Sequence, residues 1–348
     1  MTKVLRHRLF WPVFSLLALV VVNTAVRPQF VKVTVRDGEL YGALIDILRN
    51  SAPLMLVALG MTLVIATRGI DLSVGAVMAV SGAVTLTIID GSSNPGSVST
   101  VLVAMGVGVG VALLLGVWNG FLVAVLDIQP IVATLVLMLA GRGVALLITD
   151  GFITTVNSDP LEFVSTGYLF ALPFAFFISV AAIAAIALVE RRTALGVLTE
   201  AVGINPEASR LAGVRSRGII LGAYVVSGTL AGVAGIIYSS NIRAADANAA
   251  GEFIELYAIL AVVLGGTSLM GGKFTIAGTV IGVLIIQTLR STMLFLGVSS
   301  AQAPVVFALV VILVVLIQSP RVHRIARGIT GGMRTRNVPA RNDAEVAA

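Results

Sequence analysis

The chain has 348 residues, of which 57% are hydrophobic and only 11% are charged, and its mean hydropathy is +1.03. A soluble protein of this length needs far more charge to cover its surface, so the composition excludes a water-soluble fold. The absence of cysteine also excludes disulfide bonds, thiolate metal sites and cysteine nucleophiles.

Continuous apolar runs predict an all-α, polytopic transmembrane helix bundle of about ten spans, because a spanning helix needs roughly 17 to 25 mostly apolar residues. The strands of a membrane barrel would instead alternate apolar and polar residues in segments of roughly ten. The runs occupy residues 9–26, 51–67, 72–89, 101–125, 131–149, 168–189, 219–239, 254–269, 274–293 and 303–318. The eighth and tenth runs are short, which leaves open a re-entrant or tilted path for each. Basic residues precede the first run, as in a signal peptide, but no small-residue cleavage site follows it, so we interpret it as a retained anchor.

The Lys and Arg residues lie mostly in segments that fall on one side of such a bundle. By the positive-inside rule, that side is the cytoplasm, and both termini are expected there. Residues 1–8 are then a cytoplasmic N-terminus, 9–320 a transmembrane domain with a long inner loop at 190–217, and 321–348 a disordered basic tail. The net charge of +6 is explained by this topology, and the lipid bilayer rather than a nucleic acid is the expected partner.

Residues 67–75 interrupt the apolar sequence with Arg68, Asp71 and Ser73. We favour a tight inner turn in which Arg68 and Asp71 lie in water and Asp71 or Ser73 caps the next helix. The alternative is a helix broken inside the membrane and lining the translocation pathway. An acid at membrane depth costs about 2.5 to 3.5 kcal/mol on insertion scales, so Asp71 would then have to face water or a partner.

Arg142 is the one full charge in the middle of a clear run, so it is expected to face the bundle interior or a water-filled vestibule. Pairing with an acid or with helix carbonyls is favoured over contact with a substrate. Asn119, Gln129 and Gln287 are polar groups in or beside runs, and an interhelical hydrogen bond is favoured for each over a role as ligand. Four glycine pairs at four-residue spacing mark close helix contacts, either inside the chain or with a second subunit: Gly106/Gly110, Gly116/Gly120, Gly228/Gly232 and Gly278/Gly282.

The inner loop 190–217 predicts two short helices outside the membrane. Asn205 is placed to cap the second helix, Pro206 to start it, and Gly213 to stop it after Ala212. A plain surface linker is the competing interpretation. A linker has no need for the small residues spread through this loop, which favour the close approach of a partner surface.

The outer loop 240–252 carries Arg243, Asp246, Asn248 and Glu252. On residue chemistry alone, it is a solvated connection between two helices. The two histidines, His7 and His323, lie at membrane edges near arginines, where contact with lipid headgroups is the favoured role.

Four stretches carry a family resemblance. They are the run from Gly69 to Gly75, the run from Gln129 to Leu135, the loop with Thr193, Gly196, Asn205 and Gly213, and the run from Leu260 to Gly272. In this order they resemble ribose-type ABC sugar permeases, part of the branched-chain-type permease superfamily, over roughly residues 8–320. Asp37-Gly38, the run from Ile45 to Leu48 and the run from Ile242 to Asn248 are most similar to galactofuranose importer permeases, although Arg243-Ala-Ala stands where that group has Arg-Gly-Ala.

The resemblance implies a permease subunit for a monosaccharide, galactofuranose or a ribose- or galactose-like sugar, in a bacterial inner membrane. It implies three partners: a separate ATP-binding cassette ATPase, a periplasmic or lipid-anchored sugar-binding protein, and a second permease subunit that is identical or paralogous. The expected ATPase-coupling residues are Thr193, Gly196, Glu200, Ala201, Gly203, Asn205, Ala208, Arg210, Leu211 and Gly213. The translocation pathway candidates are Asp71, Ser73, Asn119, Gln129, Arg142 and Ser268. The candidates for contact with the binding protein are Arg243, Asp246 and Asn248.

Two other classes compete with this interpretation. An ion-driven secondary transporter of small polar solutes usually buries several acids near the midplane, and these runs contain almost none. A membrane-embedded enzyme needs clustered His, Asp or Glu at membrane depth, and the sequence shows no such cluster, so no enzyme activity, metal or cofactor is expected. The sequence 266–274 resembles a phosphate-binding loop only superficially, since Thr267 and Phe274 replace its first Gly and its hydroxyl residue.

Overall fold

The computed structural model describes residues 9–299, 302, 305–306, 308–309 and 312. His7, His323, the 1–8 segment, the 321–348 tail and most of the predicted run 303–318 lie outside the described residues. The chain divides into two compact units, Met1–Gly297 and Val298–Ala348. The elements below all belong to the first unit.

The described residues are mostly helical, and six helices are long and apolar enough to cross a membrane. These are α2 (Ala43–Ala66), α4 (Val98–Ala124), α5 (Pro130–Ile148), α7 (Phe174–Arg192), α10 (Ser216–Ile242) and α12 (Ile276–Phe295). Among the described residues, four shorter apolar helices accompany them: α1 (Phe10–Val26), α3 (Val74–Asp90), α8 (Leu195–Ile204) and α11 (Ile254–Leu264). The prediction of a helical, multi-span protein is confirmed at this level.

Three predicted runs differ from the observed helices. Helix α2 begins at Ala43, eight residues before its predicted run, because the helix continues through polar residues that an apolar window leaves out. Helix α7 begins at Phe174 because residues 168–173 form a β-hairpin. Helix α11 ends at Leu264 because Gly265 and Gly266 follow, and Gly266 has a φ of +86° that a helix does not contain.

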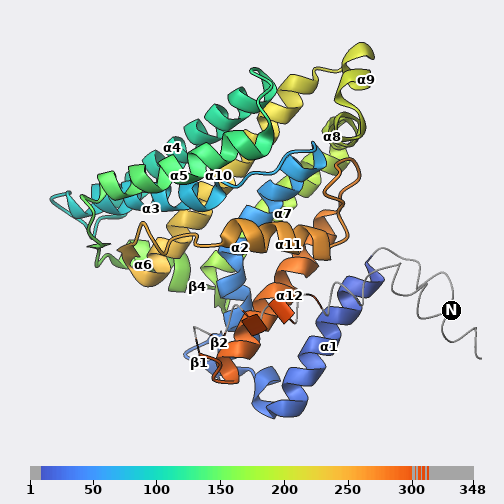
Figure 1. Ribbon diagram of the computed structural model, residues 1–348. Coiled ribbons are helices and arrows are strands. Elements are labelled where there is room, and N and C mark those ends of the chain that lie inside the picture. The colour runs from blue at the N-terminus through green and yellow to red at the C-terminus, as the bar shows by residue number, and fades with distance from the viewer. Residues whose placement is uncertain (1–8, 300–301, 303–304, 307, 310–311, 313–348) are drawn as a thin grey trace, which may run out of the picture. The chain divides into compact units, whose positions relative to one another are not determined.

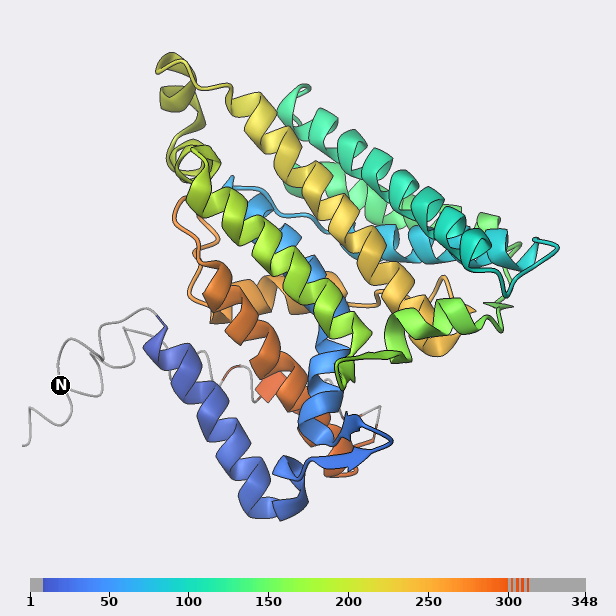
Figure 2. The same ribbon diagram turned by 180° about the vertical axis from the view of Figure 1, so that it is seen from behind.

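Helix α10 lies at the centre of the packing, in contact with α4, α3 and α2. Figure 1 and Figure 2 show α10 running alongside α4 from opposite sides of the molecule. Helix α2 in turn packs on α12, α11 and α7, and α3 packs on α4 and α5. Helices α2 and α3 are buried on most faces, whereas few residues of α7 are buried, so much of its surface is available to lipid.

Three of the four glycine pairs lie at internal helix contacts. A Cβ on Gly228 of α10 would lie 2.8 Å from the Cα of Gly116 in α4, so the two helices touch through backbone atoms. Gly282 of α12 packs in the same way on the backbone of α11 at Ala261. Gly106 and Gly110 differ, since a Cβ at either would meet no atom of the described residues within 4 Å. Three of the pairs therefore make helix contacts inside the chain, whereas Gly106 and Gly110 lie on an open face of α4.

Short elements gather at the end of the bundle away from α8 (Leu195–Ile204) and α9 (Pro206–Leu211), as Figure 1 shows for β1, β2, β4 and α6. They are η1 (Pro28–Val31), β1 (Thr34–Arg36), β2 (Glu39–Tyr41), β3 (Thr154–Thr155), α6 (Asp159–Thr166), β4 (Tyr168–Leu169), β5 (Leu172–Pro173) and β6 (Ala244–Ala245). The pairs β1–β2, β3–β6 and β4–β5 are all antiparallel. Asp37 and Gly38 turn the first hairpin with positive φ at both positions, which fits a two-residue turn.

Candidate functional site

Helices α8 and α9 form a bent segment between α7 and α10, which we call the coupling segment (residues 193–215). The Asn205 side chain accepts a hydrogen bond of 3.0 Å from the Ala208 N–H and so caps α9. Pro206 occupies the first turn, and Gly213 has a φ of +87° just beyond the helix end. The predicted pair of short helices with an Asn-Pro start is confirmed. Thr193 ties the segment to α7, since its hydroxyl donates to the Val189 carbonyl at 2.6 Å.

The coupling segment meets two other chain reversals through backbone atoms. A Cβ on Gly203 would overlap the Ala66 carbonyl oxygen at the end of α2 and lie 2.5 Å from the Gly272 nitrogen. The Gly272 N–H donates to that same Ala66 carbonyl at 3.0 Å, and Arg68 Nε donates to the Met270 carbonyl at 3.1 Å. At Gly203, α8 therefore contacts two other segments through backbone atoms alone. These are the end of α2, where the 67–73 loop begins, and the 265–272 turn.

The outer surface of the coupling segment is apolar with a charged pair. Val197, Ile204 and Leu211 are 72%, 60% and 77% exposed, so the segment presents several large apolar side chains. Arg210 forms an exposed ion pair of 2.6 Å with Glu207 one helical turn earlier. The hydrogen bond from Arg210 holds the pKa of Glu207 below its ordinary value, and the same bond raises the pKa of Arg210. An exposed apolar patch beside an arginine has the composition of a protein-docking surface.

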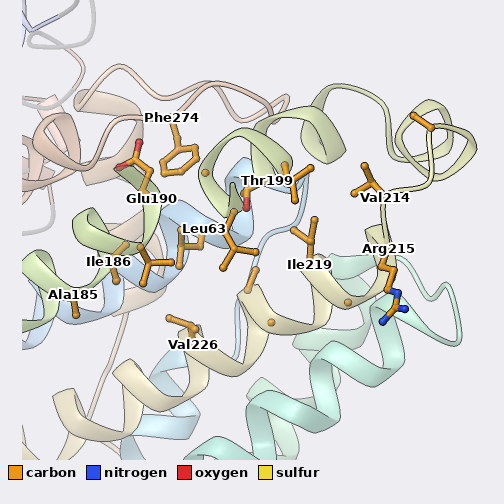
Figure 3. A pocket seen from close by; sticks show the side chains of 18 of the residues that line it. Leu63, Ala185, Ile186, Glu190, Thr199, Val214, Arg215, Ile219, Val226 and Phe274 are labelled. Atoms are coloured by element: carbon orange, nitrogen blue, oxygen red, sulfur yellow. The ribbon is translucent and has the colours of Figure 1, made fainter. Parts of the chain in front are cut away.

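A cavity of about 820 Å³ lies behind the coupling segment, between α7, α8 and α10. Figure 3 shows its mostly aliphatic lining, with Glu190 and Phe274 at one side and Arg215 near the other. On its α2 side α8 is fixed by backbone contact at Gly203, whereas on this side it borders open apolar space. The segment is therefore held at one face and has room at the other.

Asp71 lies at the centre of a buried polar network that joins three helices. Its carboxylate accepts hydrogen bonds from the Ser73 hydroxyl at 2.6 Å, the Ser73 N–H at 3.1 Å and the Ser227 hydroxyl of α10 at 2.9 Å. The Asn119 amide of α4 donates to the Ser73 hydroxyl at 2.8 Å. Asp71 is only 2% exposed, so the interpretation that placed it in water is wrong, while Arg68 is exposed as expected. The carboxylate stays buried because two serine hydroxyls and the backbone N–H of Ser73, just before α3, replace its water.

The other pathway candidates do not join this network. Gln129 is exposed where α5 begins, and Ser268 is exposed in the 265–272 turn. Arg142 of α5 is half-buried, and its guanidinium donates to the carbonyls of Ala247, Asn248 and Ala250 at 2.7 to 3.0 Å. These carbonyls belong to a loop, so Arg142 holds the connection between α10 and α11 rather than an acid or a helix end.

That connection also contains the predicted contacts for a binding protein. Arg243 ends α10 in the left-handed region and pairs with Glu162 of α6. Asp246 accepts hydrogen bonds from the N–H groups of Asn248 and Ala249 at 2.9 and 3.0 Å. Arg243 and Asn248 are exposed, and Asp246 is half-buried while it shapes the loop.

Sequence reasoning missed several polar residues at the same end of the bundle. Arg49, Tyr257 and Arg290 line a second cavity, of about 460 Å³, together with Glu252 of the outer loop and Gln287. Gln287 was expected to make an interhelical hydrogen bond, yet its Oε1 has no partner among the described residues. Arg290, three residues before the end of its predicted apolar run, was the signal that could have drawn attention to this cavity. The described residues contain no cluster of three His, Asp or Glu side chains that could hold a metal ion.

The chain has several long apolar helices that contact one another at glycines, and it carries an amphipathic segment at one end. These features define a multi-pass membrane protein. Residues 43–317 match the model of the family described as branched-chain amino acid transport system / permease component. The chain belongs to this family.

Curated relatives cover nearly the whole chain. The chain is 48% identical to the galactofuranose transporter permease protein YtfT of Escherichia coli (strain K12), over 95% of this chain and 96% of the relative. It is 40% identical to the fructose import permease protein FruF of Bifidobacterium longum (strain NCC 2705), over 93% and 91%. It is 37% identical to the ribose import permease protein RbsC of Escherichia coli (strain K12), over 88% and 92%. No solved structure matches the chain significantly.

These relatives confirm the resemblance to ribose-type and galactofuranose permeases. They also confirm that the chain is a transport component rather than an enzyme. An ion-driven carrier is set aside in favour of the permease interpretation, because the relatives that match 88% to 95% of the chain are permease proteins of sugar transporters.

Proposed function

We propose that this chain is the membrane-spanning subunit of an ATP-driven importer for a monosaccharide, with galactofuranose as the first candidate sugar. The 48% identity to a galactofuranose permease supports that choice. Fructose and ribose, which name two further relatives, also form five-membered rings, so the shared substrate class is a monosaccharide able to adopt the furanose form.

In the proposed topology the chain spans a bacterial inner membrane about ten times, with both termini and the coupling segment in the cytoplasm. The distribution of Lys and Arg along the sequence supports this orientation. The end of the bundle that carries β1, β2 and α6 then faces the periplasm. Arg243, Asp246 and Asn248 are our candidates there for contact with a soluble or lipid-anchored sugar-binding protein.

A separate ATPase docks on the coupling segment in this proposal, and a second permease subunit, identical or paralogous, completes the pathway. The single observation that carries the proposal is the backbone contact at Gly203. Because α8 touches the end of α2 and the 265–272 turn without flexible side chains between them, a displacement of α8 by the ATPase reaches both directly. The apolar cavity behind α8 gives the segment room to move.

Asp71, Ser73 and Asn119 connect the 67–73 loop to α4 and α10, so movement of α8 is passed to the helices that we propose line the pathway. The chain's own work is therefore gating and coupling. Gln129, Arg142 and Ser268 remain proposed pathway residues, and Arg142 acts in the structure by fixing the 247–250 loop.

The docking proposal is tested by a matched pair of charge reversals at exposed arginines. Arg210→Glu changes the coupling segment, and Arg36→Glu makes the same change on β1 at the opposite end. We expect Arg210→Glu to reduce co-purification of the ATPase by about tenfold, as for an arginine at the centre of an interface, and to reduce uptake of labelled D-galactose, D-fructose and D-ribose in proportion. Arg36→Glu should leave both unchanged. Equal ATPase recovery and uptake in the two variants would show that the ATPase docks elsewhere.

A further inference from the structure

The second cavity lies at the end of the bundle opposite the coupling segment. Its walls come from the beginning of α2, the ends of α10 and α12, the beginning of α11 and the loop before it. Its volume of about 460 Å³ is within the range of small-molecule sites. Arg49, Tyr238, Asn241 and Tyr257 are among its lining residues, so polar and aromatic groups from three helices converge on one space.

One amide oxygen of the lining lies deep in this wall without a hydrogen-bond partner among the described residues. Gln287 is 8% exposed, and its Oε1 accepts no hydrogen bond from the described residues. A buried amide oxygen without a donor costs about 1–3 kcal/mol, so such groups are normally satisfied by protein, water or ligand. A solute with hydroxyl donors in the cavity would supply the missing hydrogen bond.

The charges around the cavity are matched. The lining carries two guanidinium groups, Arg49 and Arg290, and one carboxylate, Glu252. Arg49 is neutralised by Asp46, which lies outside the lining and pairs with it at 3.3 Å. One positive and one negative charge then remain on the wall, and this balance favours a neutral occupant over an anion or a cation. The Arg290 guanidinium also lies 5.2 Å from the ring centroid of Tyr257, which holds both side chains in place.

Neutral monosaccharides fit this chemistry. Each carries several hydroxyl groups that both donate and accept, and an apolar C–H face that packs on aromatic rings. The cavity offers donors at Asn241 and Arg290, acceptors at Glu252 and Gln287, and the Tyr238 ring. We propose that this cavity is a sugar subsite of the permease itself, through which a neutral monosaccharide passes after release from the binding protein. This inference rests on the proposed function, and it places the transported sugar in the cavity lined by α10, α11 and α12.

The first test uses the complete transporter, with its ATPase and binding protein, in proteoliposomes. Gln287→Leu keeps the side-chain size and removes the amide. Because the amide oxygen accepts no hydrogen bond from the described residues, its removal breaks no such bond that folding depends on. The matched control is Thr292→Val on the same helix, whose hydroxyl, within the described part of the chain, bonds only its own helix at Thr288. The probe is whichever of labelled D-galactose, D-fructose or D-ribose the wild type moves fastest.

We expect Gln287→Leu to lower the amount of sugar moved per ATP hydrolysed by about threefold or more, the effect of one lost hydrogen bond, with ATP hydrolysis itself unchanged. Thr292→Val should keep the wild-type ratio. A ratio for Gln287→Leu equal to that of the control overturns the subsite. Failure of the wild type to move any of the three sugars would instead count against the proposed function.

The second test exploits the absence of cysteine from the native chain. Asn241→Cys introduces one thiol at the exposed rim of the cavity, and Val35→Cys introduces one on β1, where the native valine is 68% exposed. Saturating sugar should slow labelling of Asn241→Cys by a membrane-impermeant maleimide and leave Val35→Cys unchanged. Equal labelling rates of Asn241→Cys with and without a transported sugar would also overturn the subsite.

Discussion

At the coupling end of the bundle, α8 meets its neighbours through backbone atoms, whereas at the opposite end long polar side chains enclose a cavity. Gly203 brings α8 directly onto the Ala66 carbonyl, and no side chain stands between them to absorb a displacement. Around the polar cavity, Arg49, Gln287 and Arg290 reach inward on flexible stems. We propose that the first end transmits movement and the second adapts to a solute, and this difference in contacts supports both roles.

The coupling end is most sensitive to added volume at Gly203. Gly203→Ala places a Cβ against the Ala66 carbonyl, which forces α8 away from the end of α2. We expect a loss of about 1–3 kcal/mol in unfolding free energy from overpacking, and about a tenfold loss of uptake, equal to ~1.4 kcal/mol in the coupling step. Thermal unfolding in nanodiscs and uptake in proteoliposomes measure the two effects.

Gly222→Ala is the matched control, because Gly222 is also helical and a Cβ there meets no described atom within 4 Å. It should be neutral or stabilise α10 by up to ~1 kcal/mol through helix propensity. If Gly203→Ala behaved like this control, movement would not be passed through backbone contact.

Between the two ends, the Asp71 network is expected to matter for stability more than for solute contact. Asp71→Asn weakens the hydrogen bonds from Ser73 and Ser227 and should cost about 2 kcal/mol in thermal unfolding. Asp127→Asn is the control, since Asp127 is exposed and Asn tolerates its positive φ of 56°. If Asp71→Asn kept wild-type stability but changed the sugar preference, Asp71 would act in solute binding rather than in stability.

At the cavity end, Arg142 fixes the 247–250 loop that borders the cavity. Arg142→Met removes the guanidinium that bonds three loop carbonyls. Hydrogen exchange at the amides of Ala250 and Glu252, measured by mass spectrometry, should accelerate by about tenfold or more. Arg36→Met, a change on exposed β1, should leave those amides unaffected. Unaltered exchange in Arg142→Met would mean that the loop is held by other contacts.

The smallest effect is expected from the exposed pair of Glu207 and Arg210. The Arg210 hydrogen bond lowers the folded-state pKa of Glu207 below its usual 4.5, so the pair stabilises α9 above that pH. The stabilisation is lost as the pH falls through the lowered pKa. Because both groups are exposed and solvent-screened, protection of the α9 amides, corrected for intrinsic exchange, should change by less than about twofold. Glu207→Gln should remove this pH dependence.

The sequence predicted the apolar helices well and their ends poorly. Helix α2 continues to Ala43 through Asp46 and Arg49, because a helix can leave the apolar layer without ending. The capped start of α9 was predictable, since Asn205 and Pro206 act on their own turn. Local chemistry of this kind is visible in one sequence without any knowledge of tertiary contacts.

The partners of the candidate residues were not predictable. Asp71 finds Ser227 more than 150 positions away, and Gly203 meets Ala66 and Gly272 from two distant reversals. Likewise, the polar cavity is lined by a few residues from each of several helices, and one sequence does not show that these helices meet. These contacts depend on how α2, α10 and α12 pack, which periodicity does not specify.

The backbone join at Gly203 has a consequence for protein engineering. Since the inner face of the coupling segment requires only a bare backbone at this position, its outer face is free to vary with the ATPase that we propose docks there. Grafting residues 193–215 from a sister permease, with glycine kept at 203, should therefore transfer the choice of ATPase while the solute route stays as it is. Such chimeras offer a modular way to rewire importers of this family.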